Sequence, residues 1–222
     1  MPGISREEFL ETVRQAAAKD IPPHGHPVPP VEGEPGRAVI ENPIDYFAER
    51  VVAADMNLTR VADMVGASEA VREVLSAEEI TDVMVWPTPE MKALNLSGFR
   101  VTWWNTPGSR DNRREDAFAM MCGITGVDYA VAETGSLVLC GSEDHGRSVS
   151  MLGELHIAVV KASSIVPDLY DLYARLPVDY SDGLPANISL VTGPSKTADI
   201  ELTLVIGVHG PGKVWVVLVE DM

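Results

Sequence analysis

A strand that runs into a glycine loop is predicted at Ile188-Ser189-Leu190-Val191-Thr192-Gly193-Pro194-Ser195-Lys196-Thr197. The β-branched residues that alternate with polar ones up to Thr192 are typical of a strand. Beyond the loop, Thr197 is placed to cap a short helix over Ala198-Asp199-Ile200-Glu201-Leu202. A strand that breaks at glycine and continues as a helix is where α/β proteins hold anions, because free backbone N–H groups and the helix dipole point into the loop.

This loop differs from a phosphate-binding P-loop in two ways. The first glycine and the full spacing of that motif are missing, and Pro194 removes one backbone donor. An ordinary strand–turn–helix connection therefore stays open as the alternative. Under the anion-loop interpretation, the predicted ligand-binding residues are Gly193, Ser195, Lys196 and Thr197.

Helices and strands are predicted to alternate along most of the chain. Strands are expected at 58–61, 82–86, 99–103, 155–160, 202–206 and 213–219. Helices are expected to start at Asn42-Pro43, at Ser68, at Thr88 and at Asp168, with a further one over Asp116–Met121. Such alternation predicts an α/β fold with a mostly parallel sheet wrapped by helices.

The chain is expected to consist of three parts. Residues 1–20 begin with the capping box Ser5-Arg6-Glu7-Glu8 and predict a helix with one apolar stripe. Residues 21–41 are a linker, rich in proline and glycine, and residues 42–222 form the α/β domain. His24 and His26 lie in the linker without acidic or thiol neighbours, so no metal site is expected there. The helix on its long tether predicts an oligomer or complex in which it takes part in the contact.

Composition excludes several classes of protein. With 33 acidic and 17 basic residues, the net charge is −16, which argues against binding to nucleic acid and to anionic membrane surfaces. No apolar run is long enough to span a membrane, and the first residues are not those of a signal peptide. Cys122 and Cys140 are expected to be free buried thiols, which indicates a cytoplasmic protein. Without a G-x-G-x-x-G motif or a set of cysteines, no redox cofactor of its own is expected.

A second chemical centre is predicted at the turn Glu133-Thr134-Gly135, between strands at 128–132 and 136–139. Gly135 supplies the backbone angle that the turn needs, and Glu133 presents a carboxylate at a strand end, where it acts as a base or nucleophile or simply caps the turn. His209 is bracketed by glycines in Gly207-Val208-His209-Gly210-Pro211 and is preferred to His145 and His156 as a site residue. Glu133 and His209 are therefore the catalytic candidates, with Thr134 and Gly135 as ligand-binding candidates.

Three blocks of sequence carry a resemblance to a known family. They are Gly123-Ile124-Thr125-Gly126-Val127-Asp128-Tyr129-Ala130-Val131-Ala132-Glu133-Thr134-Gly135-Ser136-Leu137-Val138, His156 within its apolar strand, and Thr192–Glu201 together with Gly207–Pro211. From about Asn42 onward, the chain resembles the lactate utilisation protein C family, the LUD domain. In that family Asp often stands at the position of Glu133 and Thr at that of Ser136, so a carboxylate and a hydroxyl are kept.

The resemblance implies a fold similar to that of ribose-5-phosphate isomerase, CoA transferases and 5-formyltetrahydrofolate cyclo-ligase. It also implies a cytosolic subunit of a system that oxidises L-lactate to pyruvate beside iron–sulfur partner proteins. The turn at Glu133 is similar to the Glu-Asn-Gly turn of CoA transferases, in which the Glu is the nucleophile. Two alternatives stay open: a free-standing enzyme acting on a phosphorylated or acyl-CoA substrate through Glu133, and a scaffold that only binds partners. We expect the anion loop, Glu133 and His209 to converge at one end of the sheet.

Overall fold

The computed structural model describes residues 5–17, 39–105, 120–198 and 204–221, which fall into two units, Met1–Val39 and Ile40–Met222. The first unit contains helix α1 (Arg6–Ala17). Its predicted capping box is present: the Ser5 backbone N–H donates to Glu8 Oε2 at 2.9 Å, and the Glu8 N–H donates to Ser5 Oγ at 3.2 Å. Most of the predicted linker, with His24 and His26, lies outside the described residues.

The second unit is built on a six-stranded sheet in which every neighbouring pair of strands is parallel. Its order is β1-β12-β7-β4-β2-β3. The strands are β1 (Asn57–Val61), β2 (Asp82–Val85), β3 (Arg100–Trp103), β4 (Cys122–Gly126), β7 (Leu155–Lys161) and β12 (Lys213–Val219). Nearly every side chain of β4, β7 and β12 is buried, as expected for parallel strands covered on both faces. The predicted α/β class with a mostly parallel sheet is confirmed.

The helical segments of this unit are α2 (Pro43–Ala53), α3 (Met64–Ala77), α4 (Pro89–Lys92), α6 (Arg147–Met151), the 3-10 turn η1 (Ala162–Ser164) and α7 (Leu169–Asp179). Side chains cap α2, α3, α4 and α7, whereas α6 and η1 have no side-chain cap. The predicted caps Asn42, Thr88 and Asp168 each accept a hydrogen bond from a backbone N–H of the first turn. The predicted start of α3 at Ser68 is wrong, because the helix begins four residues earlier, at Met64, with Asp63 as its cap.

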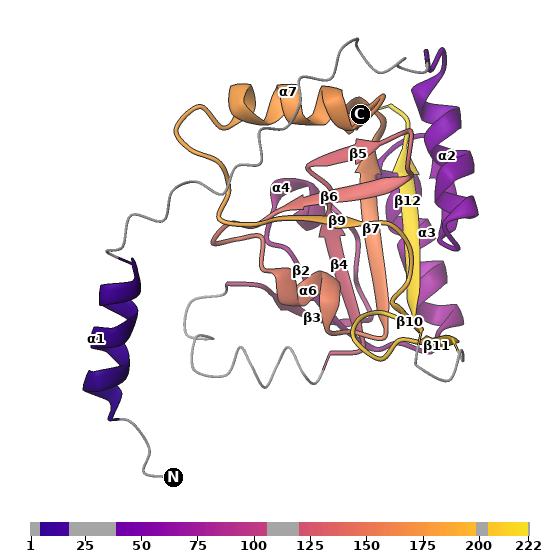
Figure 1. The fold of residues 1–222 in the computed structure, drawn as a ribbon. Coiled ribbons are helices and arrows are strands. Elements are labelled where there is room, and N and C mark those ends of the chain that lie inside the picture. Colours follow the sequence, from indigo (N-terminus) through magenta and orange to yellow (C-terminus); the bar gives the residue numbers. More distant parts are fainter. Residues whose placement is uncertain (1–4, 18–38, 106–119, 199–203, 222) are drawn as a thin grey trace. The chain divides into compact units, whose positions relative to one another are not determined.

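A second, smaller sheet lies over one face of the parallel sheet. Its order is β8-β5-β6-β9, with β8 (Ile165–Val166), β5 (Tyr129–Val131), β6 (Ser136–Cys140) and β9 (Ile188–Val191). Figure 1 shows these strands crossing in front of β7, with α3 on the far side of the large sheet and α7 over the small one. Leu137 and Leu139 of β6 belong to the core with the large sheet, whereas Val138 and Cys140 pack with α7. The small sheet thus separates two apolar layers.

Strand β4 was not predicted, although it occupies the centre of the large sheet. Its two glycines lower its strand propensity, but the close packing of α6 requires one of them: a Cβ on Gly123 would lie 1.6 Å from the carbonyl oxygen of Val149. The helix predicted over Asp116–Met121 is not borne out at its end, since Met120 and Met121 are not helical. Residues 116–119 lie outside the described part.

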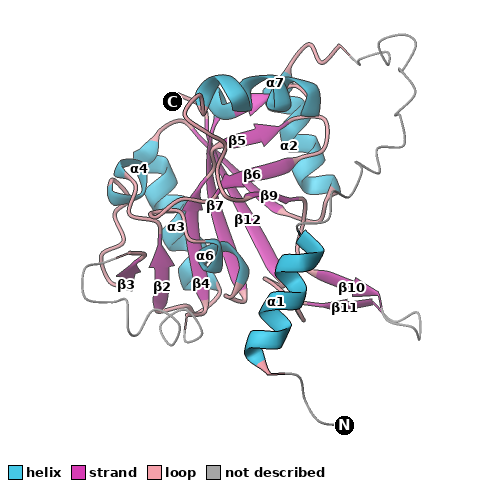
Figure 2. Ribbon diagram, turned by 60° about the vertical axis from the view of Figure 1, so that its left-hand side comes forward, coloured by secondary structure: helices cyan, strands magenta, loops and turns pink. Residues whose placement is uncertain are grey.

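The predicted role of Thr197 as a helix cap is also wrong, and residues 199–202 of the helix predicted after it lie outside the described part of the chain. Thr197 lies within strand β10 (Lys196–Ala198), which pairs antiparallel with β11 (Leu204–Ile206). Figure 2 shows these two strands as a separate ribbon beside the large sheet. Thr197 is opposite Val205 in this pairing, so its backbone belongs to a ladder and not to a helix cap. Thr197 therefore does not begin a helix directly after the Gly193 loop.

Candidate functional site

A cavity of about 510 Å³ lies at the carboxyl edge of the large sheet. In the sheet order, the strand that follows β2 in the chain, β3, lies on one side of the neighbouring pair β2 and β4, and β7, the next strand of this sheet after β4, lies on the other side. This divergence of neighbouring strands is the place where α/β sheets hold ligands. The lining includes residues that follow β2 (Trp86, Thr88, Pro89, Glu90, Met91), β4 (Val127, Asp128) and β7 (Ser163, Ser164), together with Gly126 and Lys161, the last residues of β4 and β7. Its volume is in the range of small-molecule sites.

One wall of this cavity carries an ion pair. Lys161, the last residue of β7, donates from Nζ to Glu90 Oε1 at 2.6 Å. Both side chains are about one-third exposed, so solvent screens the pair only in part. The hydrogen bond from Lys161 lowers the pKa of Glu90, which therefore stays ionised. A charged lysine is held at the carboxyl edge of the sheet by this arrangement.

A histidine and an aspartate face each other on another wall. Asp128 Oδ2 accepts a hydrogen bond from the Cys140 backbone N–H at 2.7 Å, and Asp128 Oδ1 lies 3.6 Å from His145 Nδ1. The same Nδ1 lies 3.2 Å from the carbonyl oxygen of Cys140. Because a carbonyl only accepts, Nδ1 carries the proton and the neutral ring has its lone pair on Nε2. Burial raises the pKa of Asp128, while the Cys140 N–H and His145 oppose that shift.

Two tryptophans hold the loop that presents His145. The Trp86 ring stacks on the imidazole with centroids 4.2 Å apart and planes 3° from parallel, and its Nε1 donates to the Gly146 carbonyl at 3.1 Å. Trp104 Nε1 donates to the Glu143 carbonyl, and a Cβ on Gly146 would lie 2.0 Å from the Trp104 ring. The stacked Trp86 ring thus fixes the face of the imidazole, and the hydrogen bonds from the two tryptophans fix the backbone on either side of His145.

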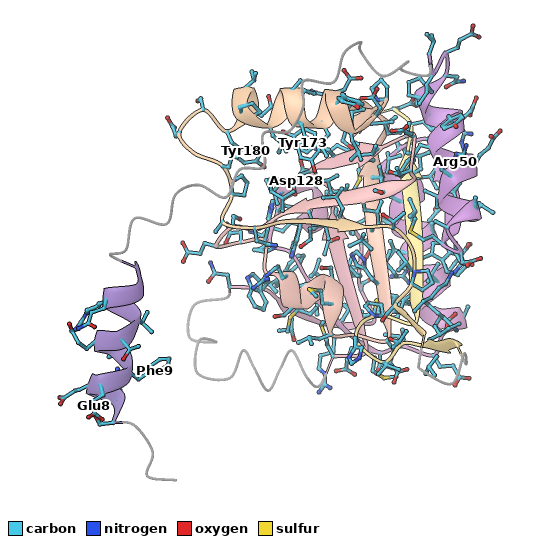
Figure 3. The ribbon with its side chains drawn as sticks, in the orientation of Figure 1. Glu8, Phe9, Arg50, Asp128, Tyr173 and Tyr180 are labelled. Atoms are coloured by element: carbon cyan, nitrogen blue, oxygen red, sulfur yellow. The ribbon has the colours of Figure 1, made fainter. Side chains whose placement is uncertain are left out.

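The third wall comes from α7 and the start of the small sheet. Tyr129 donates from its hydroxyl to Asp179 Oδ2 at 2.7 Å, and Arg175 Nε lies 3.9 Å from the same carboxylate oxygen. Burial raises the pKa of both Tyr129 and Tyr180, so both phenols stay protonated. Figure 3 shows Asp128 beneath α7, on the side where Tyr180 follows the helix.

The two cysteines are buried free thiols, as predicted. Burial raises the pKa of the Cys140 thiol to about 11 and raises that of Cys122 as well. A nucleophilic cysteine needs a lowered pKa and access to solvent. Although Cys140 lies beside the Asp128–His145 pair, its thiol is therefore not prepared for attack.

The predicted turn at Glu133 lies between β5 and β6, away from the walls described above. Glu133 is exposed, and Gly135 has a φ of +69°, as the turn was predicted to need. A Cβ on Gly135 would lie 2.7 Å from the backbone carbonyl carbon of Arg50 in α2, so the turn packs tightly on that helix. Thr134 Oγ1 lies 2.7 Å from Ser136 Oγ. The role of Glu133 as base or nucleophile stays a prediction.

The structure brings the Gly193 loop beside this turn. Ser136 Oγ lies 2.7 Å from Thr192 Oγ1, because β5 and β9 both run antiparallel to β6 and end at the same edge of the small sheet. Gly193 has a φ of +112°, and a Cβ there would lie 2.6 Å from the Ala54 carbonyl oxygen. Lys196 forms an ion pair with Asp55. The edge at which these two loops meet belongs to the small sheet, and the convergence of Ser195, Lys196 and Thr197 with Glu133 stays a prediction.

His209 lies elsewhere, at the amino edge of the large sheet. It is exposed and lines a second cavity of about 570 Å³ with Glu154, Leu155 and Lys213, where β7 and β12 begin. Glu133, Ser195, Lys196 and Thr197 are not among the residues that line this cavity. The loop that carries His209 nevertheless meets the predicted anion loop at Ser195. The Ser195 N–H donates to the Pro211 carbonyl at 2.8 Å, and the Gly207 N–H donates to the Ser195 carbonyl at 2.9 Å.

Sequence reasoning missed Lys161, Glu90 and the Asp128–His145 pair. Lys161 and Glu90 are 71 residues apart, and only the sheet order brings the ends of β4 and β7 together. A usable signal was present, however. Lys161 ends the apolar run Leu155–Val160, and Asp128 is a charged residue within the family motif, two residues after the end of β4. Charged residues at the carboxyl ends of buried parallel strands are candidates for a site.

Comparison with known proteins gives the family. The model of the LUD domain matches residues 44–219, most of the chain. The chain belongs to the LUD domain family. Relatives in this family include Lactate utilization protein C of Bacillus subtilis (strain 168), 31% identical over 235 residues that cover 98% of this chain and 97% of the relative. Lactate utilization protein C of Bacillus licheniformis is 36% identical over 170 residues, covering 72% and 71% of the two chains.

A solved structure supports the fold. The crystal structure of a DUF162 family protein from Deinococcus radiodurans at 1.70 Å resolution matches with a TM-score of 0.61 at 23% identity. The match covers 80% of this LUD chain and 96% of the other. In the described parts of this LUD protein, no helix combines the length and apolar character needed to cross a bilayer.

Proposed function

We infer that this protein acts in lactate utilisation, as a subunit of a system that oxidises L-lactate to pyruvate beside iron–sulfur partner proteins. The observation that carries this proposal is the similarity to Lactate utilization protein C of Bacillus subtilis over nearly the full length of both chains. Oxidation of a 2-hydroxy acid to a 2-oxo acid releases two electrons and two protons. In the proposal the iron–sulfur partners take the two electrons in two one-electron steps, because each cluster carries one electron at a time.

The cavity at the carboxyl edge is the place where this chain would contribute. Its walls hold a positive charge at Lys161 and an imidazole whose Nε2 is set to accept a proton. A histidine oriented through Nδ1 by an acidic partner is a common device for proton transfer. These groups suit a small polar substrate better than the exposed Glu133 does.

Deletion and complementation test the proposal. Removing the gene from a host that carries it should abolish growth on L-lactate and leave growth on pyruvate intact. The wild-type gene supplied on a plasmid should restore growth. Normal growth of the deletion strain on L-lactate would contradict the proposal. Co-purification of a tagged chain with iron–sulfur proteins, followed by their absorbance, tests the partner part independently.

The same strain separates this proposal from the two alternatives. A scaffold that only binds partners predicts that Glu133→Gln and variants in the cavity restore growth as well as the wild type does. A free-standing acyl-CoA enzyme predicts a hydroxylamine-sensitive acyl group on Glu133 when the purified chain meets its substrate alone. Neither result is expected of a subunit whose cavity takes part in the reaction.

A further inference from the structure

Two of the three carboxylates that line the cavity at the carboxyl edge face a cation. Glu90 pairs with Lys161, and Asp179 accepts from the Tyr129 hydroxyl with Arg175 nearby. The third, Asp128, accepts from the Cys140 N–H and faces His145. A ligand that enters this space therefore meets two cationic side chains, Lys161 and Arg175, as well as these carboxylates.

Lys161 has donors to spare. An ammonium carries three N–H groups, and Glu90 accepts one of them at 2.6 Å. Within the described ranges, no second acceptor reaches Nζ. A ligand carboxylate can join Glu90 around the same ammonium without breaking the existing pair. Hydrogen bonds of this kind, between charged partners, are among the strongest in proteins.

His145 provides a hydrogen-bond acceptor, whereas Lys161 provides donors. Its Nδ1–H is engaged with the Cys140 carbonyl and faces Asp128, while the stacked Trp86 ring covers one face. The ring lines the cavity, and the described residues give Nε2 no partner. Nε2 is then left as the acceptor for a ligand hydroxyl, or as the donor to a ligand carbonyl when the ring is protonated.

We propose that this cavity binds a small organic acid with a hydroxyl or keto oxygen on the carbon next to its carboxylate. Lys161 pairs with the carboxylate, and His145 Nε2 bonds to the neighbouring oxygen. The substrate class rests on the proposed function, which requires a 2-hydroxy acid as substrate and a 2-oxo acid as product. With about 510 Å³, the cavity is large enough to admit part of a co-reactant beside a three-carbon acid.

Calorimetric titration of the full chain with L-lactate, pyruvate and propionate tests the inference. Propionate has the same carboxylate and carbon chain but lacks the second oxygen. We expect L-lactate and pyruvate to bind about threefold to tenfold more tightly than propionate, which corresponds to one hydrogen bond between neutral groups. This comparison needs no variant, so it stays decisive if a substitution in the cavity prevents folding.

Matched variants locate the site. Lys161→Met and His145→Phe remove the two contacts, and Phe keeps a ring to stack on Trp86. The control is Lys213→Met, which breaks the ion pair with Glu78 at the amino edge. The first two variants should weaken binding of L-lactate about tenfold or more, as expected for a hydrogen bond to a charged group. The control should stay within about twofold of the wild type.

Three results would overturn the inference: equal binding of propionate, unchanged binding in Lys161→Met and His145→Phe, or no binding of either acid at millimolar concentration. These results are separable from a failure of the proposed function. If the deletion strain fails to grow on L-lactate but the purified chain does not bind L-lactate, the ligand site is rejected and the proposed function is kept. If L-lactate binds and the variants weaken its binding, but the deletion strain grows normally on L-lactate, the proposed function alone is rejected.

Discussion

Acid should destabilise this protein through one buried histidine, His156 in β7. Its ring is fully buried, its Nε2 lies 2.9 Å from Thr125 Oγ1, and its Nδ1 has no hydrogen-bond partner. In the register of β4 and β7, His156 lies opposite Gly123, on the face that α6 covers. Burial lowers the pKa of His156 to about 4 from its usual 6.5, because the charged ring cannot be solvated there.

The sign and size of the effect follow from linkage. Below pH 6.5 the unfolded chain binds a proton at His156 that the folded chain does not take up until about pH 4. The stabilisation is therefore complete above pH 6.5 and is lost as the pH falls toward 4. Between pH 7 and pH 5, a shift from 6.5 to about 4 corresponds to a loss of about 2 kcal/mol in the free energy of unfolding.

Urea unfolding at pH 7, 6 and 5 measures this loss, with the double variant Thr125→Val/His156→Leu as control. The double variant removes both polar partners together, so no buried group is left unpaired. Other titrating groups, including Asp128 with its raised pKa, are shared by the two proteins and cancel in the difference. The wild type should lose about 2 kcal/mol more than the variant between pH 7 and pH 5. Parallel stability curves would refute the reasoning.

Three further predictions concern packing and the domain boundary. Gly123→Ala should lower the free energy of unfolding by about 3 kcal/mol or more in urea unfolding, because its Cβ would meet a backbone carbonyl of α6. Gly126→Ala in the same strand, where the nearest atom is 4.0 Å away, is the control and should cost much less. Tyr129→Phe should lower the thermal midpoint by an amount equal to about 1 kcal/mol, because its hydrogen bond to α7 is lost; an unchanged midpoint would contradict that contact. Removing residues 1–39 should leave the urea midpoint of the remaining unit unchanged, and light scattering of the same sample tests whether this segment contributes to an oligomer.

The hydrophobic pattern predicted most strands of the large sheet, and polar residues before the helices predicted where several helices begin. Strand β12 was placed at its observed bounds, and α2 and α7 were placed through Asn42 and Asp168, because these signals are local. The misses have physical causes outside the local sequence. Gly123 lowers the strand propensity of β4, so the hydrophobic pattern did not predict this strand. The fold requires glycine at this position because α6 packs against its backbone. Thr197 has the side chain of a helix cap, but the pairing of Lys196–Ala198 with β11 places it in a strand.

The candidate site was predicted less well than the fold. Sequence reasoning favoured residues in glycine-rich loops, and two of those loops do meet through Ser136 and Thr192. The charged residues at the carboxyl edge are contributed by separate strands, so their proximity depends on the order β7-β4-β2. His145 was ranked below His209 because the sequence does not show that Trp86 and Cys140 hold it.

The place of β12 in the sheet has a consequence for synthesis. The last strand of the unit is inserted between β1, which is the first, and β7. While residues 213–219 are still inside the ribosome, β1 and β7 have no strand between them. The backbone groups of β1 and β7 that pair with β12 in the folded protein are then unpaired. Such exposed edges favour association with other chains. Stable folding of this unit during translation must therefore wait until β12 has emerged, and termination before Lys213 would leave an aggregation-prone product.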